Sequence, residues 1–132
     1  MRSGQLSVDE VQAAAADPAA GAMAVFLGVI RDHDHGRDVT GLSYSAHPSA
    51  TAQLGRVAEK IAASYSVRAI AIVHRTGDLQ VGDLAVVAAV SAEHRGDAFA
   101  ACEALIDEVK ATVPIWKHQF FLGGDSEWVN SA

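Results

Sequence analysis

Two apolar segments, residues 21–30 and 84–92, constrain the fold of this chain more than any other feature of its sequence. Neither segment contains a charged residue, and both are shorter than the roughly 18 apolar residues that a membrane-spanning helix needs. Their apolar residues continue without the polar alternation of a half-exposed strand, which is typical of strands buried on both faces. The sequence therefore predicts a buried sheet with helices packed on it.

Local signals predict three helices around these strands. A short helix begins after Ser7, because Ser7 and Glu10 have the spacing of a capping box. Pro48 suits the first turn of a second helix. This helix is predicted by apolar residues at helical spacing, namely Leu54, Val57, Ala58, Ile61, Ala62 and Tyr65. A third helix is predicted to begin at the cap Asp97 and to end before Pro114, which disfavours helix in the residue that precedes it.

The other apolar segments predict more strands, and the polar segments between them predict turns. The charged residues 31–38 are interpreted as a loop around Gly36. Further strands are expected at residues 39–46, 69–74, 115–122 and 127–129, with a short extended piece at 79–81. The fold class is therefore α+β, a single domain over residues 1–132 with helices packed on a largely antiparallel or mixed sheet.

Composition and missing motifs exclude several kinds of function. The formal net charge of -6 argues against non-specific binding to nucleic acid or to an anionic membrane, because both favour a basic surface. The sequence has no phosphate-binding loop of the Walker or GxGxxG type, no CxxC and no GxSxG motif. Its first residues lack the apolar core of a signal peptide, so we expect a soluble, cytoplasmic protein.

For several polar residues a structural interpretation outweighs a functional one. The aspartates and histidines at 32–35 could suggest metal ligands, but a solvated loop is favoured because no second cluster accompanies them. His74 and Arg75 are interpreted as a polar strand end at the surface. Cys102, the only cysteine, lies on an apolar helix face and is expected to be a buried, inert thiol.

Arg31, His94 and Arg95 are candidates for binding an anion. His94 and Arg95 follow an apolar strand and come directly before a helix, whose N-terminus attracts anions such as phosphate or carboxylate. Arg31 ends the first apolar strand, where Gly28 would let a ligand approach the backbone closely. An ordinary charged turn at 94–95 and a surface arginine at 31 are the alternatives.

Two of the three lysines, Lys110 and Lys117, lie close together in the sequence. Lys110 falls in the last turn of the third helix, where the helix dipole favours a cation and could alone explain it. Lys117 follows Pro114 and Trp116, which should pin the backbone and bury the lysine stem. A lysine that is partly desolvated in this way can act as an acid, a base or a nucleophile.

Four motifs occur in one order: FxGxIR at 26–31, HRxGxLxVGD at 74–83, HRxxAFxAC at 94–102 and VPIWK at 113–117. In order and spacing, from about residue 21 to 129, the chain resembles the large, catalytic subunit of molybdopterin synthase. The resemblance implies an α/β hammerhead-type fold and a homodimer. It also implies one small ubiquitin-like sulfur-carrier subunit on each large subunit, giving a heterotetramer.

The resemblance implies a sulfurtransferase of molybdenum cofactor biosynthesis. The Gly-Gly tail of the carrier, ending in a thiocarboxylate, would deliver sulfur to cyclic pyranopterin monophosphate (precursor Z). Two transfers would form the molybdopterin dithiolene, with no ATP, metal or other cofactor. Lys117 and Lys110 would be catalytic. Arg31, His94 and Arg95 would hold the pterin phosphate, with His94 and Arg95 coming from the second copy, and positions 118 and 119 would line the pocket.

The residues after the tryptophan depart from the common family pattern. Many members have Lys-Lys-Glu there, whereas this chain has Lys117, His118 and Gln119. The pocket is therefore expected to lack one fixed cation and one carboxylate. We expect the pKa of Lys117 to be lower here, for want of the acidic neighbour.

Other functions explain parts of the pattern. A non-catalytic module could bind an anionic metabolite through Arg31, His94 and Arg95, and it would not need Lys117. A metal-dependent hydrolase could use His33 and His35, and it would lose activity to a chelator. A diverged, inactive copy is a further alternative, although every candidate catalytic position is filled.

Overall fold

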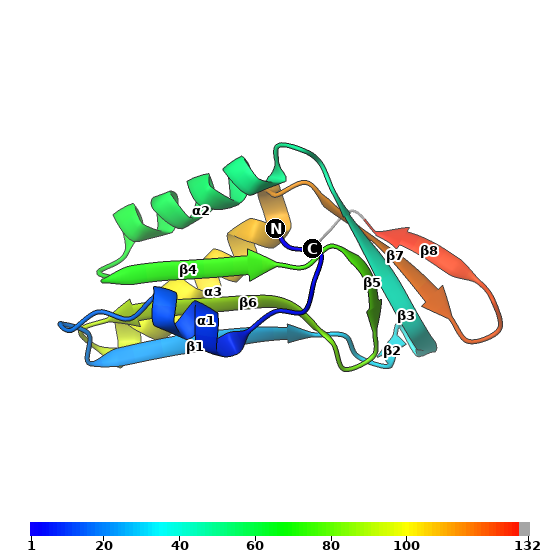
Figure 1. Ribbon diagram of the computed structural model, residues 1–132, viewed down its shortest axis with the longest axis horizontal. Helices are drawn as coiled ribbons and strands as arrows, with labels where there is room; N and C mark the ends of the chain where they lie inside the picture. Colours follow the sequence, from blue (N-terminus) through cyan, green and yellow to red (C-terminus); the bar gives the residue numbers. More distant parts are fainter. Residues whose placement is uncertain (130–132) are drawn as a thin grey trace.

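Two antiparallel sheets form the framework, as the computed structural model shows for residues 1–129 (Figure 1). One sheet has three strands in the order β1-β6-β4, and the other has five strands arranged around β3. The elements are α1 (Val8–Ala14), β1 (Ala22–Val29), β2 (His33–Asp34), β3 (Arg37–Ala46), α2 (Ala50–Ser64), β4 (Ala69–His74), β5 (Gly77–Gln80), β6 (Leu84–Ala92), α3 (Arg95–Thr112), β7 (Ile115–Phe121) and β8 (Ser126–Val129). The α+β class is confirmed.

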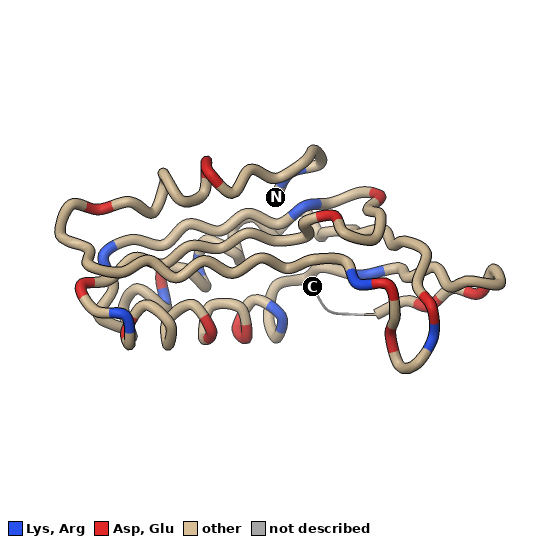
Figure 2. The backbone as a smooth tube through the Cα atoms, turned by 90° about the horizontal axis from the view of Figure 1, so that it is seen from below, with Lys and Arg blue, Asp and Glu red and all other residues tan. Residues whose placement is uncertain are grey.

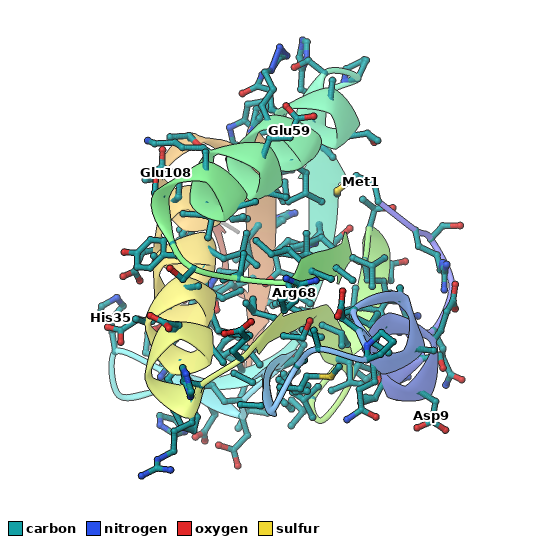
Figure 3. The ribbon with its side chains drawn as sticks, turned by 90° about the vertical axis from the view of Figure 1, so that its left-hand side faces the viewer. Met1, Asp9, His35, Glu59, Arg68 and Glu108 are labelled. Carbon is teal, nitrogen blue, oxygen red and sulfur yellow. The ribbon has the colours of Figure 1, made fainter. Side chains whose placement is uncertain are left out.

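The centre of the three-stranded sheet is β6, as its unbroken apolar sequence predicts. Ala88 of β6 pairs with Phe26 of β1 on one side and with Ile72 of β4 on the other. Helices α2 and α3 cover one face of this sheet and α1 covers the other, as Figure 3 shows. Both faces of β6 are therefore buried, and alanines along the strand let the helices approach closely.

The outer face of β1 is exposed, so the prediction that this strand is buried on both faces is wrong. Met23, Val25, Leu27 and Val29 are between 36% and 53% exposed. They lie on the same side of the sheet as α1, which packs against β4 and β6. An edge strand that is covered on one face alternates in burial, and the apolar sequence of β1 conceals this alternation.

Residues 31–38 form a short hairpin rather than an open loop. His33 pairs with Asp38, and Asp34 pairs with Arg37. The two residues between, His35 and Gly36, both have positive φ, of 49° and 78°. Two-residue hairpin turns of type I′ need positive φ at both positions, so this turn fixes the register and the direction in which Asp34 points.

The predicted helix ends are confirmed at two places and wrong at one. The Ser7 hydroxyl accepts a hydrogen bond from the Glu10 amide, 3.2 Å away, which is one half of a capping box, whereas the Glu10 carboxylate pairs with Arg2. Helix α3 ends at Thr112, just before Pro114. It begins at Arg95 with His94 as its cap, so Asp97 lies in the first turn instead, where a carboxylate complements the helix dipole.

Charged residues lie mainly on the helices and at the ends of strands (Figure 2). The three strands β1, β4 and β6 contain no Lys, Arg, Asp or Glu. Among residues 1–129, no helix combines the length and the apolar composition needed to cross a membrane.

Candidate functional site

A cavity of about 310 Å³ lies where the three-stranded sheet meets the five-stranded sheet. The strands β1, β2, β3, β4, β6 and β7 line it together with the end of α3. Its lining residues are Phe26, Leu27, Gly28, Val29, Ile30, Arg31, Asp34, Leu42, Tyr44, His74, Ala85, Val86, Lys110, Lys117 and Gln119. The structure thus brings together four of the residues singled out in the sequence, namely Arg31, Lys110, Lys117 and Gln119.

The two lysines reach the cavity from different elements. Lys110 lies in the last turn of α3, and the chain then turns at Pro114 into β7. Side chains alternate along a strand, so Lys117 and Gln119 face the cavity together. Neither lysine forms a salt bridge within the part of the chain that the structure describes, whereas Lys60, at the surface, is paired with Glu108 at 2.8 Å.

Burial lowers the pKa of Lys117. Desolvation is the main cause, and the positive charges of Lys110 and Arg31 act in the same direction. The negative charge of Asp34, and more weakly that of Glu127, opposes them. A lysine with a lowered pKa exchanges its proton more readily near neutral pH, which is the property that acid–base chemistry requires.

A carboxylate does lie in the cavity, and it belongs to Asp34. One oxygen of Asp34 accepts a hydrogen bond from Gln119 Nε2 at 2.7 Å, and the other accepts one from Arg31 at 3.1 Å. The bond from Gln119 is the main reason that the pKa of Asp34 is lowered. The cavity therefore holds one carboxylate even though position 119 is a glutamine. Burial is the main cause that lowers the pKa of Lys117 from its ordinary value, and the further effect of Gln119 in place of a glutamate stays a prediction.

His74 and Tyr44 form the floor of the cavity. His74 is 1% exposed, so its interpretation as a surface residue is wrong. Burial lowers its pKa to about 4, and burial raises the pKa of Tyr44 to about 12. Both side chains are therefore neutral at pH 7 and add polar atoms to the floor without adding charge.

Sequence reasoning missed Asp34, Tyr44 and His74 as cavity residues. Tyr44 could have been found, since it shares the apolar face of its strand with Leu42. Asp34 depends on the turn at His35 and Gly36, for which the sequence gives only the glycine as a signal. For His74, no local pattern shows that the end of β4 meets a second sheet.

Three of the predicted site residues lie outside this cavity. His94 and Arg95 line another pocket with Gly21 and Ala22, at the start of β1, whereas the cavity adjoins the end of β1. His118 lies on the opposite face of β7 from Lys117. There its ring stacks on Trp128, with centroids 4.3 Å apart and an interplanar angle of 12°. The expectation that position 118 lines the pocket is therefore not met by the cavity of a single chain.

The remaining candidates have no arrangement that would support chemistry. Within residues 1–129, no group of three or more His, Cys, Asp or Glu residues is placed to hold a metal ion. Cys102 is buried, as predicted, and its burial raises the pKa of the thiol. A buried thiol with a raised pKa is a poor nucleophile.

Comparisons with known proteins agree on one family. A family model described as the MoaE protein matches residues 1–112, a range that includes Lys110 and ends before Lys117. Molybdopterin synthase catalytic subunit 1 of Mycobacterium tuberculosis is 46% identical over 129 residues, covering 94% of this chain and 84% of the relative. The similarity to this relative therefore extends well beyond the range of the family model.

Two solved structures share the fold. The crystal structure of molybdopterin synthase from Staphylococcus aureus has a TM-score of 0.90 and 33% identity, covering 97% of this chain and 93% of that one. A complex of subunits 1 and 2 of molybdopterin-converting factor from Helicobacter pylori has a TM-score of 0.76, covering 97% of this chain and 87% of that one. At 22% identity, the second likeness shows the fold alone.

Proposed function

The chain belongs to the MoaE family, the catalytic subunits of molybdopterin synthase, and from this membership we propose that it is a sulfurtransferase. In this proposal, a small ubiquitin-like carrier subunit brings sulfur as a C-terminal thiocarboxylate. The acceptor is cyclic pyranopterin monophosphate, and two transfers form the molybdopterin dithiolene. The names of the relatives, which specify a catalytic subunit, disfavour a non-catalytic binding module.

One observation carries the proposal: Arg31, Lys110 and Lys117 line one cavity, and neither lysine is engaged in a salt bridge within residues 1–129. Both proposed substrates are anionic, one through its phosphate and the other through its thiocarboxylate. Cations in a partly desolvated cavity attract such groups more strongly than cations in water. The charge of the cavity therefore suits both substrates.

The two lysines are suited to different parts of the transfer. Once the sulfur is bonded to the pterin, water can attack the carrier's carbonyl carbon, which breaks its bond to sulfur and leaves the carrier with a carboxylate. Lys117, with its lowered pKa, can take a proton from that water and return it to the departing sulfur. Lys110 can stabilise the oxyanion that develops on that carbonyl. Each delivered sulfur uses one thiocarboxylate, so two carrier molecules are consumed for each dithiolene.

The exposed strand β1 supports a homodimer whose site is shared between two copies. Arg31 lies just beyond the end of β1, and His94 and Arg95 lie beside its start. In a dimer whose two-fold axis is perpendicular to β1, the β1 strands of the two copies would be antiparallel. Contact along β1 would then bring His94 and Arg95 of the partner subunit toward the cavity, and would cover the exposed apolar residues.

A smaller second subunit completes the proposed assembly. The Helicobacter pylori protein that shares this fold is in a complex of subunits 1 and 2 of molybdopterin-converting factor. We propose a corresponding complex for this chain, with the tail of the carrier in the cavity. A homodimer of large subunits with a carrier on each is the heterotetramer that the family resemblance implies.

Sulfur transfer in vitro tests the proposal. The purified protein would be mixed with thiocarboxylated carrier and cyclic pyranopterin monophosphate, and molybdopterin formation would be followed. We expect product from the wild type, loss of about a hundredfold or more in Lys117→Ala, and no loss in the surface control Lys60→Ala. A wild-type protein that binds the pterin but forms no product would instead support the binding module.

A further inference from the structure

Asp34 and Gln119 are joined by a hydrogen bond across strand β3. Asp34 belongs to the β2–β3 hairpin, and Gln119 belongs to β7, so both of their strands pair with β3 and not with each other. The Gln119 side chain is buried, at 3% exposure, and its amide nitrogen lies 2.7 Å from Asp34 Oδ2. This bond links the hairpin to the strand that carries Lys117.

The chemistry of the two groups fixes the direction of this bond. An ionised carboxylate only accepts hydrogen bonds, so Gln119 must present its amide nitrogen and not its oxygen. The other Asp34 oxygen accepts from Arg31 at 3.1 Å. With both oxygens engaged and the side chain only 13% exposed, the negative charge of Asp34 is held at one place in the cavity.

This fixed charge also acts on Lys117, which lines the same cavity. The charged groups acting on Lys117 are Asp34 from β2, Arg31 after β1, Lys110 from α3 and Glu127 from β8. Two are cations that oppose a charged Lys117, and Asp34 is the stronger of the two carboxylates that favour it. The neutral His74 and Tyr44 also line the cavity. Burial and the neighbouring cations lower the pKa of Lys117, and Asp34 is the main charge that raises it.

We propose that Asp34 and Gln119 act as one positioning pair, in which Gln119 holds Asp34 and Asp34 sets the protonation balance of Lys117 and the place of Arg31. An amide and a carboxylate can exchange positions and keep the hydrogen bond between them. The pair therefore predicts that Asp34→Asn is harmful alone and is rescued by Gln119→Glu. The role in catalysis rests on the proposed sulfur transfer, whereas the effect on Lys117 does not.

Four proteins test the pair: the wild type, Asp34→Asn, Gln119→Glu and the double variant. Asp34→Asn is nearly isosteric, and its side-chain oxygen can still accept from Gln119, so the fold is retained. The first readout is the titration of Lys117, followed by carbon-13 NMR of its side chain. The chain has only three lysines, so Lys60→Arg and Lys110→Arg suffice to assign the signals. The second readout is the pH profile of sulfur transfer.

The expected results differ for each variant. Asp34→Asn lowers the pKa of Lys117 further and reduces sulfur transfer about tenfold. Gln119→Glu places two carboxylates side by side, which breaks the hydrogen bond and shifts the pH profile of transfer toward higher pH. The double variant restores the wild-type titration and brings activity to within about threefold of the wild type. The control Asp32→Asn, in the same hairpin but exposed, changes neither readout.

The two readouts test the Asp34–Gln119 pair and the proposed sulfur transfer separately. A titration of Lys117 that is the same in Asp34→Asn as in the wild type would overturn the pair, and so would a double variant no better than the worse single one. If the titrations shift as expected but the wild type forms no molybdopterin, the proposed function fails and the pair stands. If the wild type is active and the single substitutions leave both readouts unchanged, the function stands and the pair fails.

Discussion

The rings of Tyr44 and His74 meet edge to face on the floor of the cavity, with centroids 4.8 Å apart and an interplanar angle of 85°. The contact fixes the imidazole of His74 between an aromatic ring and the backbone. His74 Nδ1 lies 2.7 Å from the carbonyl oxygen of Arg75, which can only accept, so Nδ1 carries the hydrogen. Nε2 is then the unprotonated nitrogen, and the ring is neutral.

The buried neutral His74 predicts a loss of stability in weak acid. Its pKa is about 4 in the folded protein and 6.5 in an unfolded chain, so the unfolded chain binds the proton first as pH falls. Stability should therefore fall from about pH 6.5 to about pH 4, by on the order of 3 kcal/mol from this group. In His74→Asn, which keeps a donor for the Arg75 carbonyl, the fall should be smaller. Urea unfolding at a series of pH values measures it, and equal pH dependence in both proteins would contradict the assignment.

Gly28 is predicted to tolerate no side chain. A Cβ at this position would lie 2.4 Å from Val86 Cγ1, and the branched Val86 has little freedom to rotate away. Gly28→Ala should therefore destabilise the protein by about 1–3 kcal/mol. The matched control is Gly55→Ala, in α2, where an added Cβ would meet no described atom within 4 Å beyond its chain neighbours and its own helix backbone. About 0.5–1 kcal/mol of stabilisation is expected there. Urea unfolding measures the free energy of unfolding of both variants. Equal changes in the two would contradict the crowding at Gly28.

Lys110→Gln is predicted to impair sulfur transfer while leaving the fold intact. The substitution removes a cavity cation, for which we expect a loss of about a hundredfold in activity. It also removes a favourable contact with the end of α3, so stability should change by less than about 1 kcal/mol. Lys60→Gln is the control, because it breaks only a surface pair with Glu108. Comparable activity in the two variants would remove Lys110 from the proposed chemistry.

Mixing two inactive variants tests whether two copies share a site. Lys117→Ala and Arg95→Ala should each be inactive when pure, because each dimer lacks one required group in both sites. Subunit exchange would form dimers in which one of the two sites is intact, so the mixture should recover about a quarter of the wild-type activity. No recovery, with exchange confirmed by mass spectrometry, would argue against a site completed by the second copy.

The elements of this fold could largely be predicted from the sequence, because local patterns determine them. The capping box at Ser7, the apolar strand β6 and the break at Pro114 each depend on a few neighbouring residues. The exposed face of β1 could not be predicted in this way. Its exposure depends on where α1 packs, and that is a contact between distant parts of the chain.

The candidate site could be predicted only in part. Arg31, Lys110 and Lys117 were singled out in the sequence and lie in one cavity, although their roles stay predictions. The sequence around Asp34 favours a solvated loop, because nothing local shows that Gln119 approaches it across β3. His94 and Arg95 lie away from the cavity of one chain, and their role depends on the second copy.

The walls of the cavity come from widely separated parts of the chain, beginning at Phe26 and ending at Gln119. A ribosome makes β7 after every other element that lines the cavity. All three strands of the first sheet are therefore made before the site can be complete, and a chain that is cut short before Lys117 would contain those strands but lack one wall of the pocket. During synthesis the function is thus acquired last, in the step that joins the second sheet to the first.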